Sequence, residues 1–340
     1  MPQLIAVVKI RDLRAYASRI RGRNEPTFNV RFLADSKTRG IVTSQPRKAP
    51  ASKASGSRAA QHRTNSSDRK SEPIEEVSAH EADDIEDHAR LRTPIIYEIV
   101  RREGEREMAR PITSLWWSGL AAGLSISFSL LAQAIAYVHL PDVAWRPLIS
   151  SFGYSVGFLM VVLARQQLFT ENTITVVLPL MAKFNVRNLR RLGRMWGVVL
   201  AANLVGTLCA ALFCRYSLVL APLLRDGMLE LSRQMMENSW PEMFFKGIAA
   251  GFLIATMVWL IPSAEGAKFQ VVTMATYLIA AGGFTHIIAG SFEGFLLVVN
   301  GQLGLWRMVS DFSIPVLLGN IVGGAALFAV LSYAQVMDEM

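Results

Sequence analysis

The residues best suited to chemistry interrupt two otherwise apolar stretches of the chain. His286 stands within the run VVTMATYLIAAGGFTHIIAG, and Glu293 follows it by two helical turns. Glu171 lies in a second interruption, RQQLFTEN. An imidazole has an ordinary pKa of about 6.5 and exchanges protons at physiological pH. Because ionisable side chains are costly inside a membrane, their presence there predicts a pathway for protons or substrates.

Two of these residues also have a purely structural interpretation. His286 would then only hydrogen-bond Thr170 and hold the two interruptions together. Glu293 would be an interfacial residue at the outer end of its helix instead of an acid of the pathway. The residue types alone fit both interpretations.

Glu171 has the widest range of roles. It would form an ion pair with Lys246 or Arg165, or it would cap the half-helix that begins at Asn172, where free N–H groups favour negative charge. As a pathway acid beside His286 it would favour the imidazolium and at the same time oppose the approach of an anion. Asn172 is counted with Glu171 among the candidate pathway residues.

The composition is that of an integral membrane protein. Of the 340 residues, 51% are hydrophobic and 18% are charged, and the mean hydropathy is +0.30. A soluble chain of this length is less apolar. The two cysteines, Cys209 and Cys214, stand five residues apart in one apolar run, where a helix points them in different directions. We therefore expect no disulfide, no metal site and no cofactor.

Six apolar runs are long enough to cross about 30 Å of hydrocarbon as helices, which predicts an all-α membrane protein with six transmembrane helices. The runs are Ile112–Val138, one beginning at Ile149, Met195–Phe213, Gly247–Ile261, one beginning at Val271, and Ile314–Tyr333. The polar interruptions fall in the second and fifth runs. They predict that helices 2 and 5 are broken inside the membrane.

The two halves of this pattern resemble each other in sequence. Three segments recur in order: GLAAG at 119–123 as GIAAG at 247–251, FTE at 169–171 as FTH at 284–286, and VLAANLVG at 199–206 as VLLGNIVG at 316–323. This alignment pairs Glu171 with His286. Three crossings leave the second half upside down, so the sequence predicts two inverted three-helix repeats. Broken helices in equivalent places mark the substrate route, because irregular backbone is tolerated only where it faces protein or a water-lined path.

The charged connections predict the orientation of the chain. The segment KFNVRNLRRLGR, between the second and third runs, has five basic residues and no acid, which is typical of a cytoplasmic loop. With six crossings, both termini are then cytoplasmic and the segment Arg215–Glu242 lies outside.

Residues 1–93 are predicted to form a disordered cytoplasmic tail, basic at first and then acidic. Residues 1–70 contain 16 Lys and Arg against 4 Asp and Glu, which leaves 19 against 23 in the rest of the chain. The tail lacks the interleaved aromatics and motifs of nucleic-acid modules, so no nucleic-acid partner is expected. Residues 94–111 predict an amphipathic lead-in helix with Thr93 as its N-cap, either solvated or lying on the membrane surface. A transmembrane domain follows at 112–335.

The motifs LFTEN in the second run, GGFTHIIAG in the fifth and GNIVGG in the sixth resemble the formate/nitrite transporter family over roughly residues 94–335. The resemblance implies an aquaporin-like fold and a homopentamer with one pore per subunit, embedded in lipid in a bacterial inner membrane. It also implies passage of small monovalent anions or their conjugate acids, such as formate, nitrite and hydrosulfide. No enzymatic activity is expected.

The resemblance assigns roles to five residues. His286 becomes the central residue of the pathway. Leu168, Phe169 and Thr170 match the family's loop in the second span, where the phenylalanine constricts the pore and the threonine faces the histidine. Lys246 matches a basic residue near the start of the fourth span, which raises the local potential for anions.

Four positions depart from the family's pattern. Glu171 stands where a small residue is usual, and Gly251 and Gly290 stand where the family has asparagines. Glu293 is an unusual acid in its helix. The polar groups that would hold a small anion are therefore fewer, and two carboxylates lie near the route, as in a divergent branch of the family.

These observations favour a channel or secondary transporter for small weak-acid anions, with a proton given to the anion by His286. Protonation would remove much of the cost of taking a charge out of water. The alternatives are a pathway for protons, a small cation or a neutral solute on the same fold, and a membrane scaffold that transports nothing.

Overall fold

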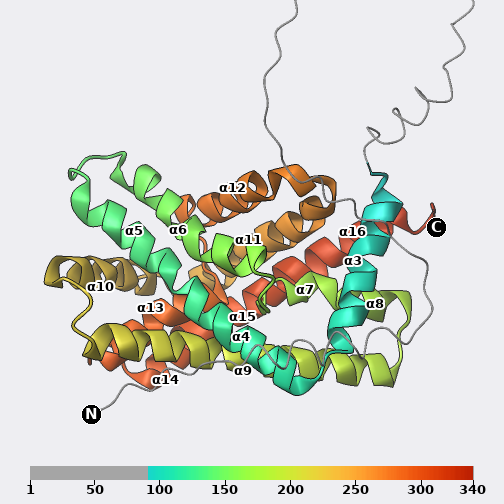
Figure 1. Cartoon of the computed structure of the whole chain (residues 1–340), viewed down its shortest axis with the longest axis horizontal. Coiled ribbons are helices and arrows are strands. Elements are labelled where there is room, and N and C mark those ends of the chain that lie inside the picture. Colours follow the sequence, from blue (N-terminus) through green and yellow to red (C-terminus); the bar gives the residue numbers. More distant parts are fainter. Residues whose placement is uncertain (1–90, 340) are drawn as a thin grey trace, which may run out of the picture. The chain divides into compact units, whose positions relative to one another are not determined.

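The computed structural model describes residues 91–339, and every regular element in this part of the chain is a helix (Figure 1). The α-helices are α3 Thr93–Met108, α4 Ile112–Ile126, α5 Phe128–His139, α6 Arg146–Leu163, α7 Asn172–Thr175, α8 Val177–Ala182, α9 Val186–Tyr216, α10 Pro222–Met236, α11 Trp240–Leu260, α12 Lys268–Ala281, α13 Ile287–Val299, α14 Leu305–Arg307, α15 Ile314–Ile321 and α16 Val330–Val336. Short 3₁₀ turns follow α11 at Ile261–Ser263 and Glu265–Ala267. All but the last three residues of the predicted tail lie outside the described residues, so the tail stays a prediction.

Five continuous helices in the described residues are long and apolar enough to cross a membrane: Ile112–His139, Arg146–Leu163, Val186–Tyr216, Trp240–Ser263 and Leu305–Val336. They coincide with five of the six predicted runs. The fifth run is divided into α12 and α13, which have 14 and 13 residues. At a rise of about 1.5 Å per residue, neither piece alone spans the hydrocarbon. The predicted interruptions in the second and fifth runs are therefore present as breaks between helices.

Small residues bring two helix pairs into close contact. A Cβ added to Gly206 of α9 would lie 2.9 Å from the Cα of Gly123 in α4. A Cβ added to Gly319 of α15 would lie 3.0 Å from the Cα of Gly247 in α11. Such close backbone approach is typical of packed membrane helices. The last long helix also contains two π-helical stretches, Met308–Ser313 and Val322–Ala329.

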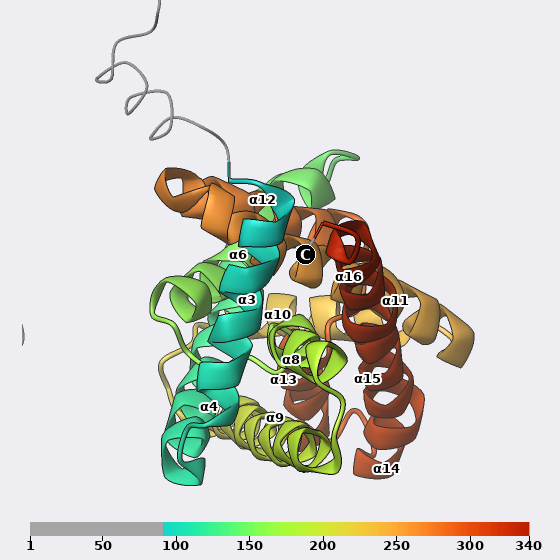
Figure 2. The ribbon, with the colours of Figure 1, turned by 90° about the vertical axis from the view of Figure 1, so that its right-hand side faces the viewer.

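The lead-in helix α3 packs against the helical core. It begins at Thr93 with Arg92 at the N-cap and no side-chain cap bond, so the predicted Thr93 cap is wrong by one residue. Tyr97 and Val100 are buried, and α3 contacts α7, α8 and α16 (Figure 2). A Cβ on Gly104 would overlap the carbonyl oxygen of Thr175, so α3 lies directly on the short helix α7.

The outward side of α3 carries a local ion-pair network. Arg101 donates to the two carboxylate oxygens of Glu98 at 2.7 and 2.8 Å, and Arg102 donates to the same group at 2.6 Å. These hydrogen bonds hold the pKa of Glu98 at about 2. Pairs at this spacing support the helix by a few tenths of a kcal/mol, roughly.

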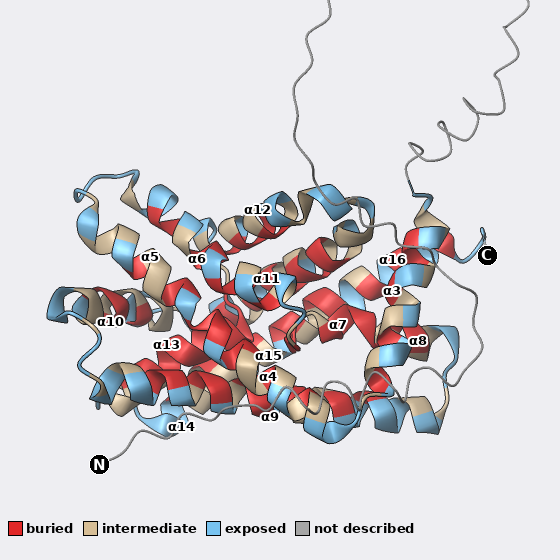
Figure 3. Ribbon diagram, viewed as in Figure 1, coloured by how far each residue is buried: buried red, intermediate tan, exposed pale blue. Residues whose placement is uncertain are grey.

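Burial is densest around the two breaks. Figure 3 shows buried residues concentrated on α7 and α13. All four residues of α7 are buried, and so is most of α13, from Ile287 to Leu297. A short helix that is buried on all sides lies in the interior of the helical assembly. The two breaks and the helices that follow them, α7 and α13, therefore lie in the core.

Candidate functional site

Both breaks begin with the same backbone turn. Arg165 and Gly283 have positive φ angles of 52° and 61°, which turn the chain out of helix α6 and helix α12. In each turn an N–H donates to the carbonyl five residues earlier: Gln166 to Val161 at 3.0 Å, and Phe284 to Ile279 at 2.9 Å. This is the Schellman ending of a helix, for which glycine is the usual turning residue.

Asn203 of α9 holds the backbone of the first break. Its side-chain oxygen accepts the N–H of Phe169 at 2.9 Å. Its amide group donates to the carbonyls of Gly119 in α4 and Gln167 in the break, at 2.7 and 2.9 Å. The buried backbone groups of the loop are thereby satisfied, as interior polar groups require.

Asn320 of α15 makes the same three bonds in the second break. It accepts from the N–H of Ile287 at 2.9 Å. It donates to the carbonyls of Gly247 in α11 and Thr285 in the break, at 2.8 and 3.1 Å. Asn203 and Asn320 therefore hold the backbone of the two breaks in the same way, and neither side chain lines either cavity of the site.

The two asparagines fix how the breaks correspond. Gln167 and Thr285 receive the same bond, so the breaks align at a spacing of 118 residues. The alignment of 169–171 with 284–286 is therefore wrong by three residues, and Leu168 is equivalent to His286. The bonds of the asparagines to the backbone define the correct alignment. The Phe-Thr pair that the two breaks share, at 169–170 and 284–285, stands at different positions of the two loops. The other two sequence pairings agree with the bonds of the asparagines.

His286 connects the two breaks. Its Nε2 lies 2.7 Å from Oγ1 of Thr170. Its Nδ1 accepts the N–H of Ala289 at 3.2 Å, which caps the start of α13. A nitrogen that accepts from a backbone N–H carries no proton, so in this geometry the proton of the imidazole is on Nε2 and points to Thr170. Both side chains are buried.

One aromatic ring packs against this pair. Phe158 of α6 packs edge-on against the His286 ring at a centroid distance of 5.0 Å. The ring of Phe169 instead packs against Trp196 at 5.7 Å. Trp196 donates to the carbonyl of Asn172 at 3.1 Å. This tryptophan therefore faces the core, although its place near a span end predicts an interfacial position.

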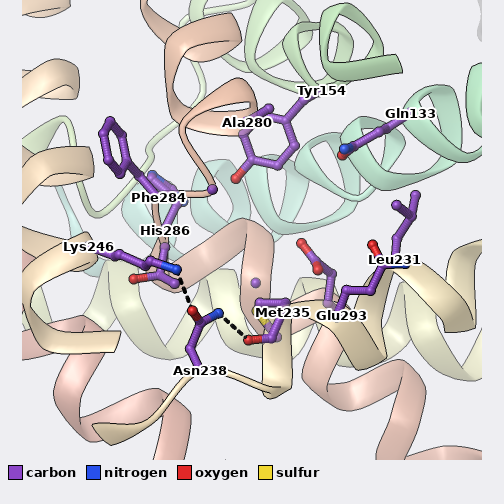
Figure 4. Close-up of a pocket in the computed structure, with 14 residues that line it drawn as sticks. Gln133, Tyr154, Leu231, Met235, Asn238, Lys246, Ala280, Phe284, His286 and Glu293 are labelled. Carbon is purple, nitrogen blue, oxygen red and sulfur yellow. Dashed lines mark hydrogen bonds between the residues drawn. The ribbon is translucent and has the colours of Figure 1, made fainter. Parts of the chain in front are cut away.

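A cavity of about 270 Å³ opens on one side of His286 (Figure 4). It is called the outer cavity, and a second one the inner cavity, after the orientation that the sequence predicts. Lys246 and Glu293 both line the outer cavity together with the histidine. The Lys246 ammonium donates to the side-chain oxygen of Asn238. The side-chain amide N–H of Asn238 donates to the carbonyl of Met235. The structure thus brings together three of the predicted site residues around one cavity.

An inner cavity of about 380 Å³ is lined by residues from α3, from the first break and from α7. Glu171 and Asn172 both line it. Asn172 donates to the side-chain oxygen of Gln167 at 3.1 Å, and Gln167 donates to Glu107 of α3 at 2.9 Å. These bonds connect the lead-in helix to the first break.

Glu171 forms neither the predicted cap nor the predicted ion pair. It occupies the N-cap position of α7, but its side chain makes no cap bond there. The N–H groups at the start of α7 are already bonded to carbonyls of the preceding turn, including that of Glu171 itself. Lys246 lines the outer cavity, and within residues 91–339 no basic group pairs with Glu171. One of its carboxylate oxygens is buried without a partner in this region.

The two glycine departures have a packing explanation. A Cβ on Gly251 would overlap the carbonyl oxygen of Asn320, and one on Gly290 would lie 2.5 Å from the ring of Phe312. Gly251 faces α15 and does not line either cavity. An asparagine side chain therefore has no room at either position unless the neighbouring atoms move.

Several site residues were missed at the level of sequence. Phe158, Tyr154 and Gln133 lie beside His286 or in the outer cavity. One signal was available for Tyr154, because Ser151, Tyr154 and Ser155 form a polar stripe at helical spacing in an apolar run. Gln133 carries no such signal, since it is a single amide in an otherwise apolar helix.

Long apolar helices and two broken helices that meet at buried polar side chains define a polytopic membrane protein. Residues 94–334 match the model of the formate/nitrite transporter family. The chain therefore belongs to this family of transmembrane transport proteins.

Curated relatives agree with this assignment. The chain is 44% identical over 255 residues to the inner membrane protein YfdC of Escherichia coli, covering 75% of this chain and 82% of the relative. It is 26% identical over 247 residues to the formate channel FocA of Haemophilus influenzae, covering 65% and 86%. The family and these relatives are transporters, channels and membrane proteins, and none is described as an enzyme.

Solved structures share the fold at low sequence identity. An FNT family ion channel aligns with a TM-score of 0.62 at 20% identity, covering 71% of this chain and 98% of that chain. A pentameric formate channel with formate bound aligns with a TM-score of 0.56 at 20% identity, covering 66% and 98%. At this identity the likeness establishes the fold.

Proposed function

We propose that this protein is a channel or secondary transporter for small monovalent weak-acid anions of the formate, nitrite and hydrosulfide class. The observation that carries the proposal is the pair of His286 and Thr170, which joins the two helix breaks. His286 lines the outer cavity, and Glu171, the residue next to Thr170, lines the inner one. The permeant crosses between the cavities at this pair. The formate channels among the relatives and structural neighbours support the substrate class.

The membrane arrangement is part of the proposal. Six crossings form two inverted three-helix halves of aquaporin-like type, and the equivalent bonds of Asn203 and Asn320 support this repeat. The protein is a homopentamer in a bacterial inner membrane with both termini in the cytoplasm. The pentameric structural neighbour and the inner-membrane relative support this assembly and location.

Proton exchange at His286 lets the anion cross as a neutral acid. The neutral imidazole presents its Nε2 proton to Thr170. To donate that proton and remain neutral, the ring must first bind a second proton on Nδ1, which breaks the bond from Ala289. Protonation of His286 therefore requires a local change at the start of α13. The gain is that the permeant no longer carries a charge through the buried core.

The flanking residues have supporting roles in this mechanism. Leu168 and Phe169 form the apolar constriction next to Thr170, and both are buried. Lys246 raises the electrostatic potential of the outer cavity and so favours anions there. Asn172 and Glu171 form part of the wall of the inner cavity.

Stopped-flow uptake into proteoliposomes tests the proposal, with formate, nitrite, hydrosulfide and acetate compared across a pH series. Uptake of one anion should rise as the pH falls and should collapse in His286→Asn. An intact oligomer that admits none of the four anions would overturn the proposal. If no small solute at all crosses, a scaffold role is the remaining interpretation.

A second function is favoured by one observation. Glu171 lines the inner cavity and Glu293 lines the outer one, and neither carboxylate has an ion-pair partner among residues 91–339. Two carboxylates on either side of a histidine suit a pathway for protons, a small cation or a neutral solute. The same vesicles, loaded with a pH-sensitive or cation-sensitive dye, distinguish this function from anion transport.

A further inference from the structure

Glu293 is a buried carboxyl in the outer cavity that the mechanism above does not use. Its exposed fraction is 9%, and it lines the cavity together with His286. Within the described part of the chain, its oxygens have no hydrogen-bond or ion-pair partner. The carboxyl is therefore free to bind and release a proton, because no other group competes for its oxygens.

Glu293 lies on the same side of α13 as His286. The two residues are seven positions apart, which is two turns of an α-helix, and both face the same cavity. In the other half of the chain, the position equivalent to Glu293 at a spacing of 118 residues is Thr175. Thr175 lines the inner cavity. The equivalent position thus lines a cavity in each half of the chain. It is a threonine in the first half and an acid in the second.

The other titratable groups of the outer cavity leave Glu293 unpaired. They are Tyr154 from α6, Lys246 from α11 and His286 at the N-cap of α13. Lys246 is bonded to Asn238 and forms no ion pair with Glu293. The helices α5 and α10 contribute only neutral side chains to this cavity: Gln133, Leu231, Gln234 and Met235.

The space between Glu293 and His286 suits proton movement. The cavity of about 270 Å³ has room for several water molecules, each of which needs about 30 Å³. Figure 4 shows the carboxyl of Glu293 and the hydroxyl of Tyr154 on the walls of this cavity, together with the side chain of His286. A chain of cavity water and a phenol hydroxyl can carry a proton between a carboxyl and an imidazole.

We infer that Glu293 is the outer proton carrier of the pathway, which supplies His286 with the proton that accompanies each anion. This inference rests on the proposed function. The carboxyl loses a proton and becomes a carboxylate, while the imidazole gains it and becomes an imidazolium. The imidazolium then gives its Nε2 proton to the anion, which leaves as the neutral acid. The ring returns to its first tautomer when Nδ1 releases its proton to water and Nε2 binds another. The carboxylate regains a proton from the outer water, so one proton crosses with each anion.

The test uses the full-length protein in vesicles in which the outer cavity faces the external buffer. Formate uptake is followed across an external pH series at fixed internal pH, for the parent, Glu293→Gln and Glu237→Gln. Glu237 is an exposed acid just after α10 that does not line the cavity, so its replacement is a matched change of charge. In Glu293→Gln, uptake at acidic external pH should fall about tenfold, and its dependence on external pH should flatten. Glu237→Gln should behave as the parent.

Two results separate failure of the inference from failure of the proposed function. If the parent takes up formate and Glu293→Gln keeps the parent's pH profile, Glu293 is not the proton carrier and the proposed function stands. If the parent oligomer takes up none of the weak acids, both are overturned. Glu293→Thr supplies a second neutral side chain, the residue found at 175, in case the glutamine variant does not assemble. Glu293→Asp should restore the pH dependence at a lower rate.

Discussion

Ala289 donates its backbone N–H to Nδ1 of His286 at 3.2 Å, so His286, the proposed central residue of the pathway, is also the N-cap of α13. The same ring contacts Thr170 across the two breaks. Any proton that His286 binds on Nδ1 therefore removes a cap and frees an N–H at the start of a buried helix. The chemistry of the site and the local stability of α13 are coupled through this one bond.

The two roles of His286 are separable by mutation. Asparagine is among the best N-cap residues, so His286→Asn should keep the cap, whereas His286→Ala should lose about 1 kcal/mol of stability. Both variants should lose the acid-stimulated uptake of weak acids, because neither side chain titrates in this range. Thermal unfolding in detergent and vesicle uptake give the two readouts. Parent-like, pH-dependent uptake by His286→Asn would rule out proton exchange at this residue.

Asn320 should be a major determinant of stability. Asn320→Ala removes three hydrogen bonds and leaves the buried N–H of Ile287 and two carbonyls without partners. The expected loss in unfolding free energy is about 3 kcal/mol. Asn300 donates one bond to the carbonyl of Leu296 in its own helix, so Asn300→Ala should cost less than about 1 kcal/mol. Equal losses in the two variants, measured by denaturant titration, would contradict the clamp role of Asn320.

The sequence predicts the fold well because the bilayer restricts it. Long apolar runs must be helical to satisfy their backbone groups, so the runs at 112–138 and 195–213 predict their helices correctly. The breaks were also predictable, since Gly283 and the polar RQQLFTEN segment interrupt otherwise continuous apolar stretches. The lead-in helix at 94–111 was predicted as well, although its docking on α7 depends on Gly104, which has no periodic signal.

The site was predictable only in part. The resemblance to the family predicts that Thr170 faces His286, and the two side chains do lie in contact. The role of Glu171 was not predictable. Whether a side chain caps a helix depends on whether the helix N–H groups are free, and here carbonyls of the preceding turn occupy them. The equivalence of Leu168 and His286 became visible only from the hydrogen bonds of the backbone, because the shared Phe-Thr pair in the sequence favours a different alignment.

Close packing between α11 and α15 should make Gly251 intolerant of substitution. A methyl group in Gly251→Ala would overlap the carbonyl oxygen of Asn320 and displace the residue that holds the second break. The expected cost is about 2 kcal/mol, together with a loss of transport. Gly193 of α9 has no neighbouring atom within 4 Å of an added Cβ, so Gly193→Ala should be neutral or stabilising by up to about 1 kcal/mol. Thermal unfolding of both variants checks the contrast, and a neutral Gly251→Ala would show that the helices are less closely packed.

Glu171 decides between the two proposed kinds of permeant. A carboxylate in the inner cavity repels anions and attracts cations, and this one has a buried oxygen without a partner within residues 91–339. If anions are the permeant, Glu171→Gln should increase anion flux about tenfold, since a repulsion of about 1.4 kcal/mol corresponds to that factor. If protons or a small cation are the permeant, the same change should reduce their flux. Glu237 is an exposed acid that lines neither cavity, so Glu237→Gln is the control that should change neither flux. Uptake of formate and of protons, measured in the same vesicles for both variants, gives the answer, and an unchanged anion flux in Glu171→Gln would place its carboxylate off the anion route.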